Sequence, residues 1–125
     1  MPGTVIGIPC FNEEEFIAGT LISALRQLDD ASDLEIHISD NCSTDETLRR
    51  VESVIDASPK HASKVHVHLQ TSTTTVEGNF WNVFDTTDSE FFLWLGAHDQ
   101  ISSQYIFRGV GHIVANPTTS MFCGT

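Results

Sequence analysis

The sequence predicts an α/β domain with three layers, in which helices cover both faces of a mostly parallel sheet. Short apolar, β-branched segments alternate with longer segments of helical periodicity, in the order β-α-β-α-β-α-β-α-β. The 125 residues are enough for one domain with a core and too few for two. We therefore expect a single domain over residues 1–125, with ligands bound beyond the carboxyl ends of its strands.

The first strand and helix are predicted from residues 4–28. Residues 4–8 are apolar and β-branched, and Pro9 is expected to end the strand. Asn12 is a candidate N-cap, because three acidic residues follow it in what would be the first helical turn. The apolar face of the helix consists of Ile17, Leu21, Ala24, Leu25 and Leu28.

Residues 34–39 form the second predicted strand, because apolar and polar side chains alternate there. Ser43 with Glu46 three residues later is the signature of a capping box. The helix that it opens is expected to end before Ser58-Pro59, because the residue that precedes a proline disfavours helical backbone.

The third strand is predicted at residues 64–70, followed by a polar loop at 71–75. Residues 77–85 contain Phe80, Trp81, Val83 and Phe84, a pattern that suits a short and heavily buried helix.

Residues 91–95 are predicted to form the fourth strand. They are apolar on both faces, which is typical of a central strand. A helix is expected at 103–115 and a fifth strand at 120–123.

The charge balance restricts the possible partners. Seventeen acidic residues stand against six Lys and Arg, giving a net charge of −11. Such a chain repels nucleic acids, anionic membranes and phosphorylated metabolites, so we expect no nucleic-acid partner. A phosphate-rich ligand would need backbone amides at helix N-termini or a divalent cation.

Three cysteines with no CxxC or zinc spacing indicate reduced thiols in a cytosolic protein. The first residues have no basic region, and no apolar run approaches the roughly 20 residues of a membrane helix. We therefore expect a cytoplasmic protein without a signal peptide.

Polar segments follow the predicted strands, with PCFNEEE after the first, SDNCSTDET after the second and GAHDQ after the fourth. Phe11 offers a flat apolar face, and Asn12 offers an amide that can both donate and accept. Asp40 could accept from a nucleotide base or from ribose hydroxyls. It could equally close an Asx turn that opens the next helix.

Asp99 and His98 follow the fourth strand and are candidate metal ligands. A carboxylate is a hard oxygen ligand and an imidazole is a borderline nitrogen ligand. A cation held here could neutralise a diphosphate. Alternatively, Asp99 caps the next helix and His98 only packs against a neighbour.

His66 and His68 lie two residues apart on one face of the third strand, a spacing that a metal site could use. No third ligand is evident, so a half-exposed polar strand face is the favoured interpretation.

Four segments of the chain resemble the family-2 glycosyltransferases of GT-A fold. They are IPCFNE (8–13), SDNCSTDETL (39–48), GNFWN (78–82) and FLWLGAHD (92–99), in the order and approximate spacing of that family. The resemblance implies a Rossmann-like domain that binds a UDP- or GDP-type nucleotide-diphospho-sugar donor. It also implies a divalent cation, Mn²⁺ or Mg²⁺, and transfer with inversion at the anomeric carbon.

The resemblance also implies roles for individual residues. Those implied to contact the nucleotide are Pro9, Cys10, Phe11, Asn12, Glu13, Asp40 and Asn41. His98 and Asp99 match the last two positions of the metal motif, with Asp99 as the main ligand, although Gly96 and His98 stand where the family often has Asp. Asn82 matches an Asn that the family often places on its helix.

Family members are considerably longer, and their C-terminal half holds the acceptor site and the general base. We therefore expect this chain to be the nucleotide-binding half of a longer enzyme, with no general base assigned. The acceptor is unknown and could be a glycan, a lipid or a protein. An uncovered strand edge would favour self-association.

Two other classes of function remain open from the residues. One is a non-catalytic module of the same fold. The other is a phosphoacceptor receiver domain, which needs an Asp at the end of its third strand and a Lys after its fifth. Here the third strand ends in Leu69-Gln70-Thr71 and no Lys follows Lys64, so a receiver domain is disfavoured.

Overall fold

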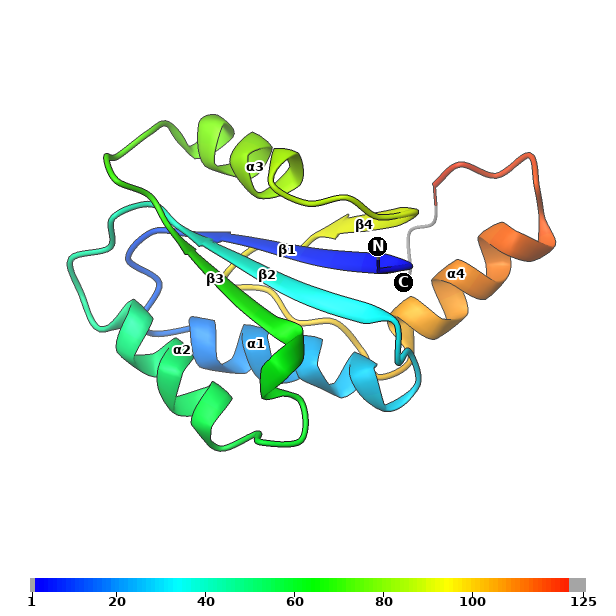
Figure 1. Cartoon of the computed structure of the whole chain (residues 1–125), viewed down its shortest axis with the longest axis horizontal. Coiled ribbons are helices and arrows are strands. Elements are labelled where there is room, and N and C mark those ends of the chain that lie inside the picture. The colour runs from blue at the N-terminus through cyan, green and yellow to red at the C-terminus, as the bar shows by residue number, and fades with distance from the viewer. Residues whose placement is uncertain (1, 122–125) are drawn as a thin grey trace.

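The computed structural model describes residues 2–121, which form a four-stranded parallel sheet flanked by helices (Figure 1). The strand order is β3-β2-β1-β4. The elements are β1 (Thr4–Cys10), α1 (Ile17–Arg26), η1 (Gln27–Asp29), β2 (Leu34–Asp40), α2 (Thr47–Asp56), η2 (Ala62–Lys64), β3 (Val65–Leu69), α3 (Val76–Asp85), β4 (Phe91–Trp94) and α4 (Tyr105–Ala115). The predicted α/β class and parallel sheet are confirmed.

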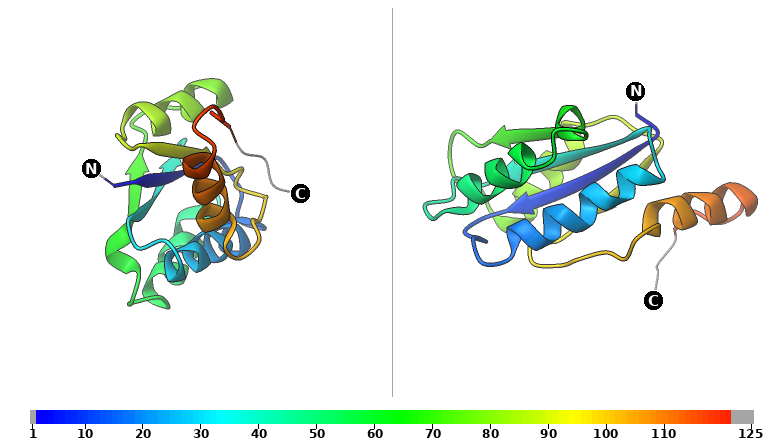
Figure 2. Two further views of the ribbon diagram at one scale, coloured as in Figure 1. Left: turned by 90° about the vertical axis from the view of Figure 1, so that its right-hand side faces the viewer. Right: turned by 90° about the horizontal axis from the view of Figure 1, so that it is seen from below.

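The helices form layers on the two faces of the sheet (Figures 1 and 2). α1 and α2 lie together on one face, and α3 packs on β1 and β2 from the other. α4 lies near the end where β1 begins, away from the end toward which the strands run. Within residues 2–121, no helix has the length and apolar character needed to cross a membrane.

The main core lies between the sheet and α1 with α2. All seven residues of β1 are buried, because β1 has a strand on each side and helices on both faces. The alternation seen in the sequence of β2 directs its apolar residues into this core. The residues of this core cluster with no exposed surface are Ile6, Ile8, Ile17, Leu21, Ala24, Leu34, Ile36, Ile38 and Val51.

Pro9 does not end β1, contrary to the prediction. The strand continues to Cys10, and Pro9 pairs with Ser39 of β2. The carbonyl of Gly7 accepts from Leu95 N (2.9 Å), so Gly7 and then Pro9 direct their backbone polar groups toward the β4 side. β4 ends at Trp94, before the position opposite Pro9, so no strand residue on that side would accept a hydrogen bond from residue 9. The missing N–H of Pro9 therefore removes no hydrogen bond between strands.

Neither predicted N-cap is used. α1 begins at Ile17 rather than directly after Asn12, and α2 begins at Thr47 rather than after Ser43. Asn12 and Ser43 instead join the loops after β1 and β2, because Asn12 N donates to Ser43 Oγ (2.9 Å). Asp45 accepts from Thr47 N (2.9 Å) at the start of α2.

β4 lies at the edge of the described sheet, so the prediction of a central strand is wrong. Its apolar residues are only partly buried, and Trp94 is exposed. On the α3 side, Phe92 and Trp94 pack with Trp81 and Phe84, at ring-centroid separations of 5.0–5.9 Å. Its two apolar faces therefore reflect packing against helices and not a second flanking strand.

The predicted fifth strand at 120–123 is only partly within the described residues. Ser120 and Met121 are not in a strand, and Phe122 and Cys123 lie outside the described residues.

Gly7 allows α3 and β4 to approach β1 closely. A Cβ at this position would lie 2.5 Å from Phe92 Cζ and 3.1 Å from Val83 Cγ1. Both neighbours are held by packing, since Val83 is fully buried and Phe92 stacks edge-on against Phe84. A larger residue at position 7 would therefore push the α3 layer away from the sheet.

We predict that Gly7→Ala lowers the free energy of unfolding by about 1–3 kcal/mol, because it overpacks this contact. Gly111→Ala is the matched control. A Cβ at Gly111 meets nothing within 4 Å on the exposed side of α4, so this change should raise stability by about 0.5–1 kcal/mol. Urea denaturation of both variants measures these values, and equal effects would contradict the proposed packing role of Gly7.

Candidate functional site at the carboxyl end of the sheet

A cavity of about 240 Å³ lies where β1 and β2 end and the loop after β4 begins. This is the edge of a parallel α/β sheet at which ligands bind. Its lining residues are Pro9, Cys10, Phe11, Glu13, Asn41, Val76, Asn79, Phe80, Gly96, Ala97 and His98.

Two larger hollows, of about 450 and 420 Å³, lie along α4 and β4. Their shared lining includes Phe91, Ile106 and Val110, which leaves them largely apolar. They do not contain the polar groups that follow the strands. We therefore assign the candidate site to the smaller cavity.

Six of the nine predicted site residues line this cavity: Pro9, Cys10, Phe11, Glu13, Asn41 and His98. The other three do not line it: Asp40 is the last residue of β2, and Asn12 and Asp99 lie in the loops after β1 and β4. The structure thus brings the predicted segments together, but only some of their side chains face the cavity, and others bond within the loops.

Asp40 is buried, with 2% of its surface exposed. Its carboxylate accepts from Ser43 N (3.0 Å) and Ser43 Oγ (2.5 Å), which closes a turn after β2. The Cys10 thiol also points at this carboxylate, at 3.5 Å. The geometry favours the Asx-turn interpretation of Asp40 over a ligand contact.

Cys10 and Cys42 are free thiols. Burial, reinforced by the Asp40 carboxylate, raises the pKa of the Cys10 thiol far above its usual range. Cys10 therefore stays protonated at neutral pH and is unsuited to act as a nucleophile.

Asn41 connects the end of β2 to the loop before α3. Its Nδ2 donates to Thr74 O (2.7 Å), and its Oδ1 accepts from Thr74 N (2.8 Å). The next residue, Thr75, caps α3 by accepting from Gly78 N (2.9 Å). Asn41 thereby fixes the α3 wall of the cavity.

Phe11 and Asn12 form a turn at the mouth of the cavity. Asn12 has a φ of 50°, a left-handed conformation that Asn tolerates better than most residues. Its Oδ1 accepts from Thr44 N (2.8 Å), which anchors the turn to the loop after β2. The Phe11 side chain remains substantially exposed, with 45% of the residue surface accessible.

Glu13, His98 and Asp99 are candidate metal ligands. Glu13 Oε1 lies 3.5 Å from His98 Nδ1. A Cβ built on Gly96 would lie 2.7 Å from Asp99 Oδ2 and 4.0 Å from His98 Cε1. The Asp99 carboxylate therefore occupies the space that a side chain at position 96 would take, and His98 lies beside it.

The ends of β1 and β2 are joined by a buried amide that the sequence did not predict. Asn79 on α3 donates from Nδ2 to Ser39 O (3.0 Å) and to Cys10 O (3.4 Å). Its Oδ1 accepts from Ser39 Oγ (2.8 Å) and from Gln70 Nε2 (3.0 Å). The available signal was a polar residue three positions before Asn82 on a largely apolar helix.

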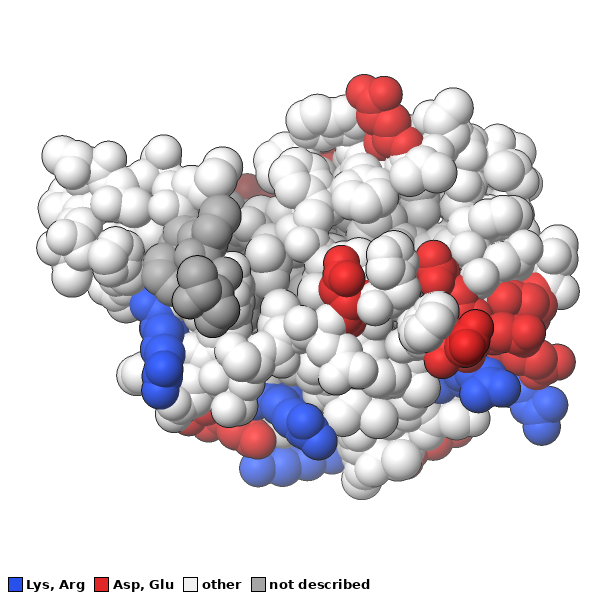
Figure 3. Space-filling view, turned by 180° about the vertical axis from the view of Figure 1, so that it is seen from behind, with Lys and Arg blue, Asp and Glu red and all other residues white. Residues whose placement is uncertain are grey.

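Acidic side chains gather at the end of the molecule toward which the strands run (Figure 3). The loops there include Glu13–Glu15, Asp45 and Glu46. An anionic ligand at this end would therefore need a cation or backbone amides to offset the repulsion.

Comparison with known families identifies a match over nearly the whole chain. The model of Glycosyl transferase family 2 matches residues 5–125. A search of curated proteins found no match.

Solved structures of glycosyltransferases share the fold. TarS of S. aureus aligns with a TM-score of 0.76 and 22% identity over 90% of this chain and 20% of its own. TarS 1–349 in complex with UDP-GlcNAc aligns with a TM-score of 0.74 and 19% identity, over 98% of this chain and 37% of its own. The mannosyltransferase PcManGT from Pyrobaculum calidifontis, in complex with GDP-Man and Mn²⁺, aligns with a TM-score of 0.81 and 20% identity. The alignment covers 94% of this chain and 34% of PcManGT. The aligned part thus spans between 20% and 37% of the chains in these three structures.

We predict that Asn79→Ala lowers the free energy of unfolding by about 1–3 kcal/mol, because the buried Ser39 hydroxyl loses its acceptor and Ser39 O loses the amide donor. Asn82→Ala is the control, since Asn82 makes one partly buried bond, to Ser39 Oγ (3.1 Å). Chemical denaturation compares the two. A loss in Asn79→Ala no larger than in Asn82→Ala would contradict the role assigned to Asn79.

Proposed function

This chain belongs to glycosyl transferase family 2, and from that premise we propose that it binds a nucleotide-diphospho-sugar donor for inverting glycosyl transfer. The observation that carries the proposal is the cavity at the carboxyl end of the sheet, formed by the segments that resemble the family. The neighbours that contain UDP-GlcNAc, or GDP-Man with Mn²⁺, support a UDP- or GDP-type donor.

In this proposal the base of the nucleotide lies against Phe11. An exposed aromatic ring at a cavity mouth offers a face for stacking, and stacking of a base on an aromatic side chain contributes about 1–3 kcal/mol. Asn12 and Asn41 act mainly by fixing the two loops on either side, because their amides already bond to Thr44 and Thr74.

A divalent cation completes the proposed site. Asp99 and His98, with Glu13 beside His98, offer oxygen and nitrogen ligands at the start of the loop after β4. This mixture of carboxylate and imidazole suits Mn²⁺ better than Mg²⁺, which prefers oxygen ligands. When bound, the cation would neutralise the diphosphate and stabilise the charge of the leaving group.

We place the acceptor site and the general base outside residues 1–125. The relatives are much longer than this chain. Whether the acceptor is a glycan, a lipid or a protein depends on surfaces in that remaining part. Inversion would require the base to take the proton of the acceptor hydroxyl while that oxygen attacks the anomeric carbon from the face opposite the departing diphosphate.

A nucleotide-binding module without turnover is the second candidate. The observation that favours it is the turn made by Asp40, whose buried carboxylate is occupied by Ser43 and not directed at the cavity. This candidate predicts no turnover of the donor. If the protein hydrolyses a UDP- or GDP-sugar, even slowly, and Asp99→Asn hydrolyses it more slowly still, the candidate is contradicted.

We predict that Mn²⁺ tightens the binding of UDP or GDP by tenfold or more, equivalent to about 1.4 kcal/mol. Asp99→Asn should abolish this metal-dependent gain because it removes a charged oxygen ligand. Asp56→Asn at the exposed end of α2 removes the same charge elsewhere and should retain the gain. Calorimetric titration with and without Mn²⁺ measures each value, and no binding to either nucleotide would refute the proposal for this chain.

The contribution of His98 can be measured separately. We expect His98→Asp to bind Mn²⁺ more tightly, because the change adds a carboxylate beside Asp99 where the family often has Asp. Direct Mn²⁺ titration compares the variant with the native chain, and unchanged affinity would show that position 98 is not a ligand position.

We also propose self-association through β4 and α4. β4 is an edge strand, and Trp94 and Phe107 expose 38% and 57% of their surfaces beside the large apolar hollows. Phe107→Glu should shift the chain toward the monomer, whereas Leu69→Glu on the opposite sheet edge should not. Light scattering at high concentration tests this, and a monomeric native chain would contradict it.

A further inference from the structure

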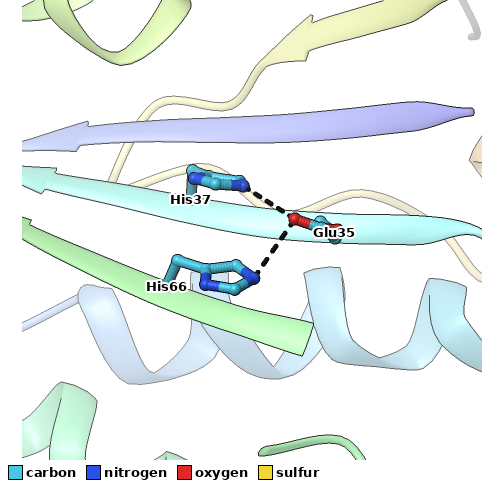
Figure 4. Close-up of side chains that lie close together, drawn as sticks. All are labelled: Glu35, His37 and His66. Atoms are coloured by element: carbon cyan, nitrogen blue, oxygen red, sulfur yellow. Dashed lines mark hydrogen bonds and ion pairs between the residues drawn. The ribbon is translucent and has the colours of Figure 1, made fainter. Parts of the chain in front are cut away.

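Four polar side chains gather on the outer part of the sheet, on the face that carries α3. Glu35 and His37 come from β2, and His66 and His68 come from β3. The parallel register pairs His37 with His66 and Ser39 with His68, so all of these side chains lie on one face. Figure 4 shows the Glu35 carboxylate directed at the rings of both His37 and His66.

The ligand atoms of three of these residues are spaced as a metal ion requires. Glu35 Oε1 lies 3.1 Å from His37 Nε2 and 3.2 Å from His66 Nε2. All three ligand atoms lie within 4.8 Å of one another. Four ligands in tetrahedral geometry at about 2.0–2.1 Å from Zn²⁺ are separated from one another by about 3.3 Å. Small side-chain movements would therefore be enough to surround an ion.

The rings are held in place before an ion arrives. His37 and His66 stack with their centroids 4.6 Å apart, which keeps both Nε2 atoms at the same carboxylate. The other ring nitrogen of His37, Nδ1, lies 2.8 Å from His68 Nε2. Metal-binding histidines usually have such a hydrogen bond on the second nitrogen, which fixes the ring orientation.

The chemical types of the side chains in the cluster also suit a divalent cation. Neutral imidazole is the form that coordinates a metal. Glu35 supplies a negative charge that favours a divalent cation.

We propose that Glu35, His37 and His66 bind one Zn²⁺ ion, with water in the fourth position. Two imidazoles and one carboxylate are ligands typical of zinc, whereas Mg²⁺ and Ca²⁺ prefer all-oxygen sites. The side chains of Glu35 and His66 are 27% and 42% exposed, so an ion can enter from solvent.

Binding requires a tautomeric change within the cluster. In the metal-free state, the N–H groups at Nε2 of His37 and His66 donate to Glu35. When the ion takes Nε2 of His37, the ring proton moves to Nδ1 and is donated to His68 Nε2. His68 then carries its own proton on Nδ1, so His37 and His68 stay neutral, and His66 shifts its proton to Nδ1 in the same way.

This site is distinct from the proposed nucleotide site. Glu35 precedes Asp40 by five residues along β2, a distance of about 16 Å in an extended strand. The ion would join β3, which pairs only with β2 in the described sheet, to the interior of the sheet. Because an unfolded chain does not hold these ligands together, zinc binding stabilises the fold.

The test is titration of the protein with Zn²⁺ by calorimetry and with Co²⁺ by visible absorption. We expect one ion per chain, an intense Co²⁺ spectrum typical of four ligands, and a higher thermal midpoint with Zn²⁺. His66→Gln should weaken Zn²⁺ binding at least tenfold and abolish the rise in the thermal midpoint. His66 is half exposed, so this variant should fold.

Matched variants separate this site from other sources of zinc affinity. His61→Gln, whose histidine pairs with Asp29 elsewhere on the surface, and Asp56→Asn at the exposed end of α2 should both bind Zn²⁺ as the native chain does. His68→Ala should weaken binding about 10- to 100-fold through loss of ring orientation. Unchanged Zn²⁺ affinity in His66→Gln, equal losses in His61→Gln, or a weak six-coordinate Co²⁺ spectrum would overturn the proposal.

Discussion

The buried amide of Asn79 is the contact on which the carboxyl end of the sheet depends. Strands that end in the interior leave carbonyl groups that water cannot reach, and a buried polar group without a partner destabilises the fold by about 1–3 kcal/mol. Asn79 donates to Ser39 O and to Cys10 O, which also accepts from Asn41 N (2.9 Å), while its own oxygen accepts from Ser39 and Gln70. One side chain thus fixes β1, β2 and α3 together, and the loops after β1 and β2, which line the cavity, start from these fixed ends.

The alternating pattern predicted the elements well because it reflects local burial. The helices and strands between residues 4 and 115 occur where periodicity placed them, with boundaries shifted by a few residues. The errors occur where the extent or place of a strand depends on a neighbour that is distant in the sequence. Pro9 stays in β1 because β4 ends before its level, and β4 lies at the edge although both of its faces are apolar. Neither fact can be derived from residues 4–10 or 91–95 alone.

The same limit applies to the candidate site. The sequence predicted that these segments meet at one end of the sheet, because carboxyl ends of parallel strands share an edge. It could not show that Asp40 turns back to Ser43, or that Asn41 is occupied by Thr74, since these bonds depend on loop conformation. It also paired His66 with His68 and found no third ligand. The missing ligands, Glu35 and His37, lie on the adjacent strand and become visible only from the register between β2 and β3.

The two proposed metal sites differ in the chemistry of their ligands, and this difference determines which ion each should select. At the carboxyl end, the acidic loops and the exposed carboxylate of Asp99 favour a cation that keeps several coordination positions for phosphate oxygens, as Mn²⁺ does. On the β2–β3 face, two imidazoles and one carboxylate stand at tetrahedral spacing, which favours Zn²⁺. A net charge of −11 attracts cations to the whole surface without distinguishing among them. Selectivity must therefore come from ligand type and spacing, which the fold sets separately at the two ends of β2.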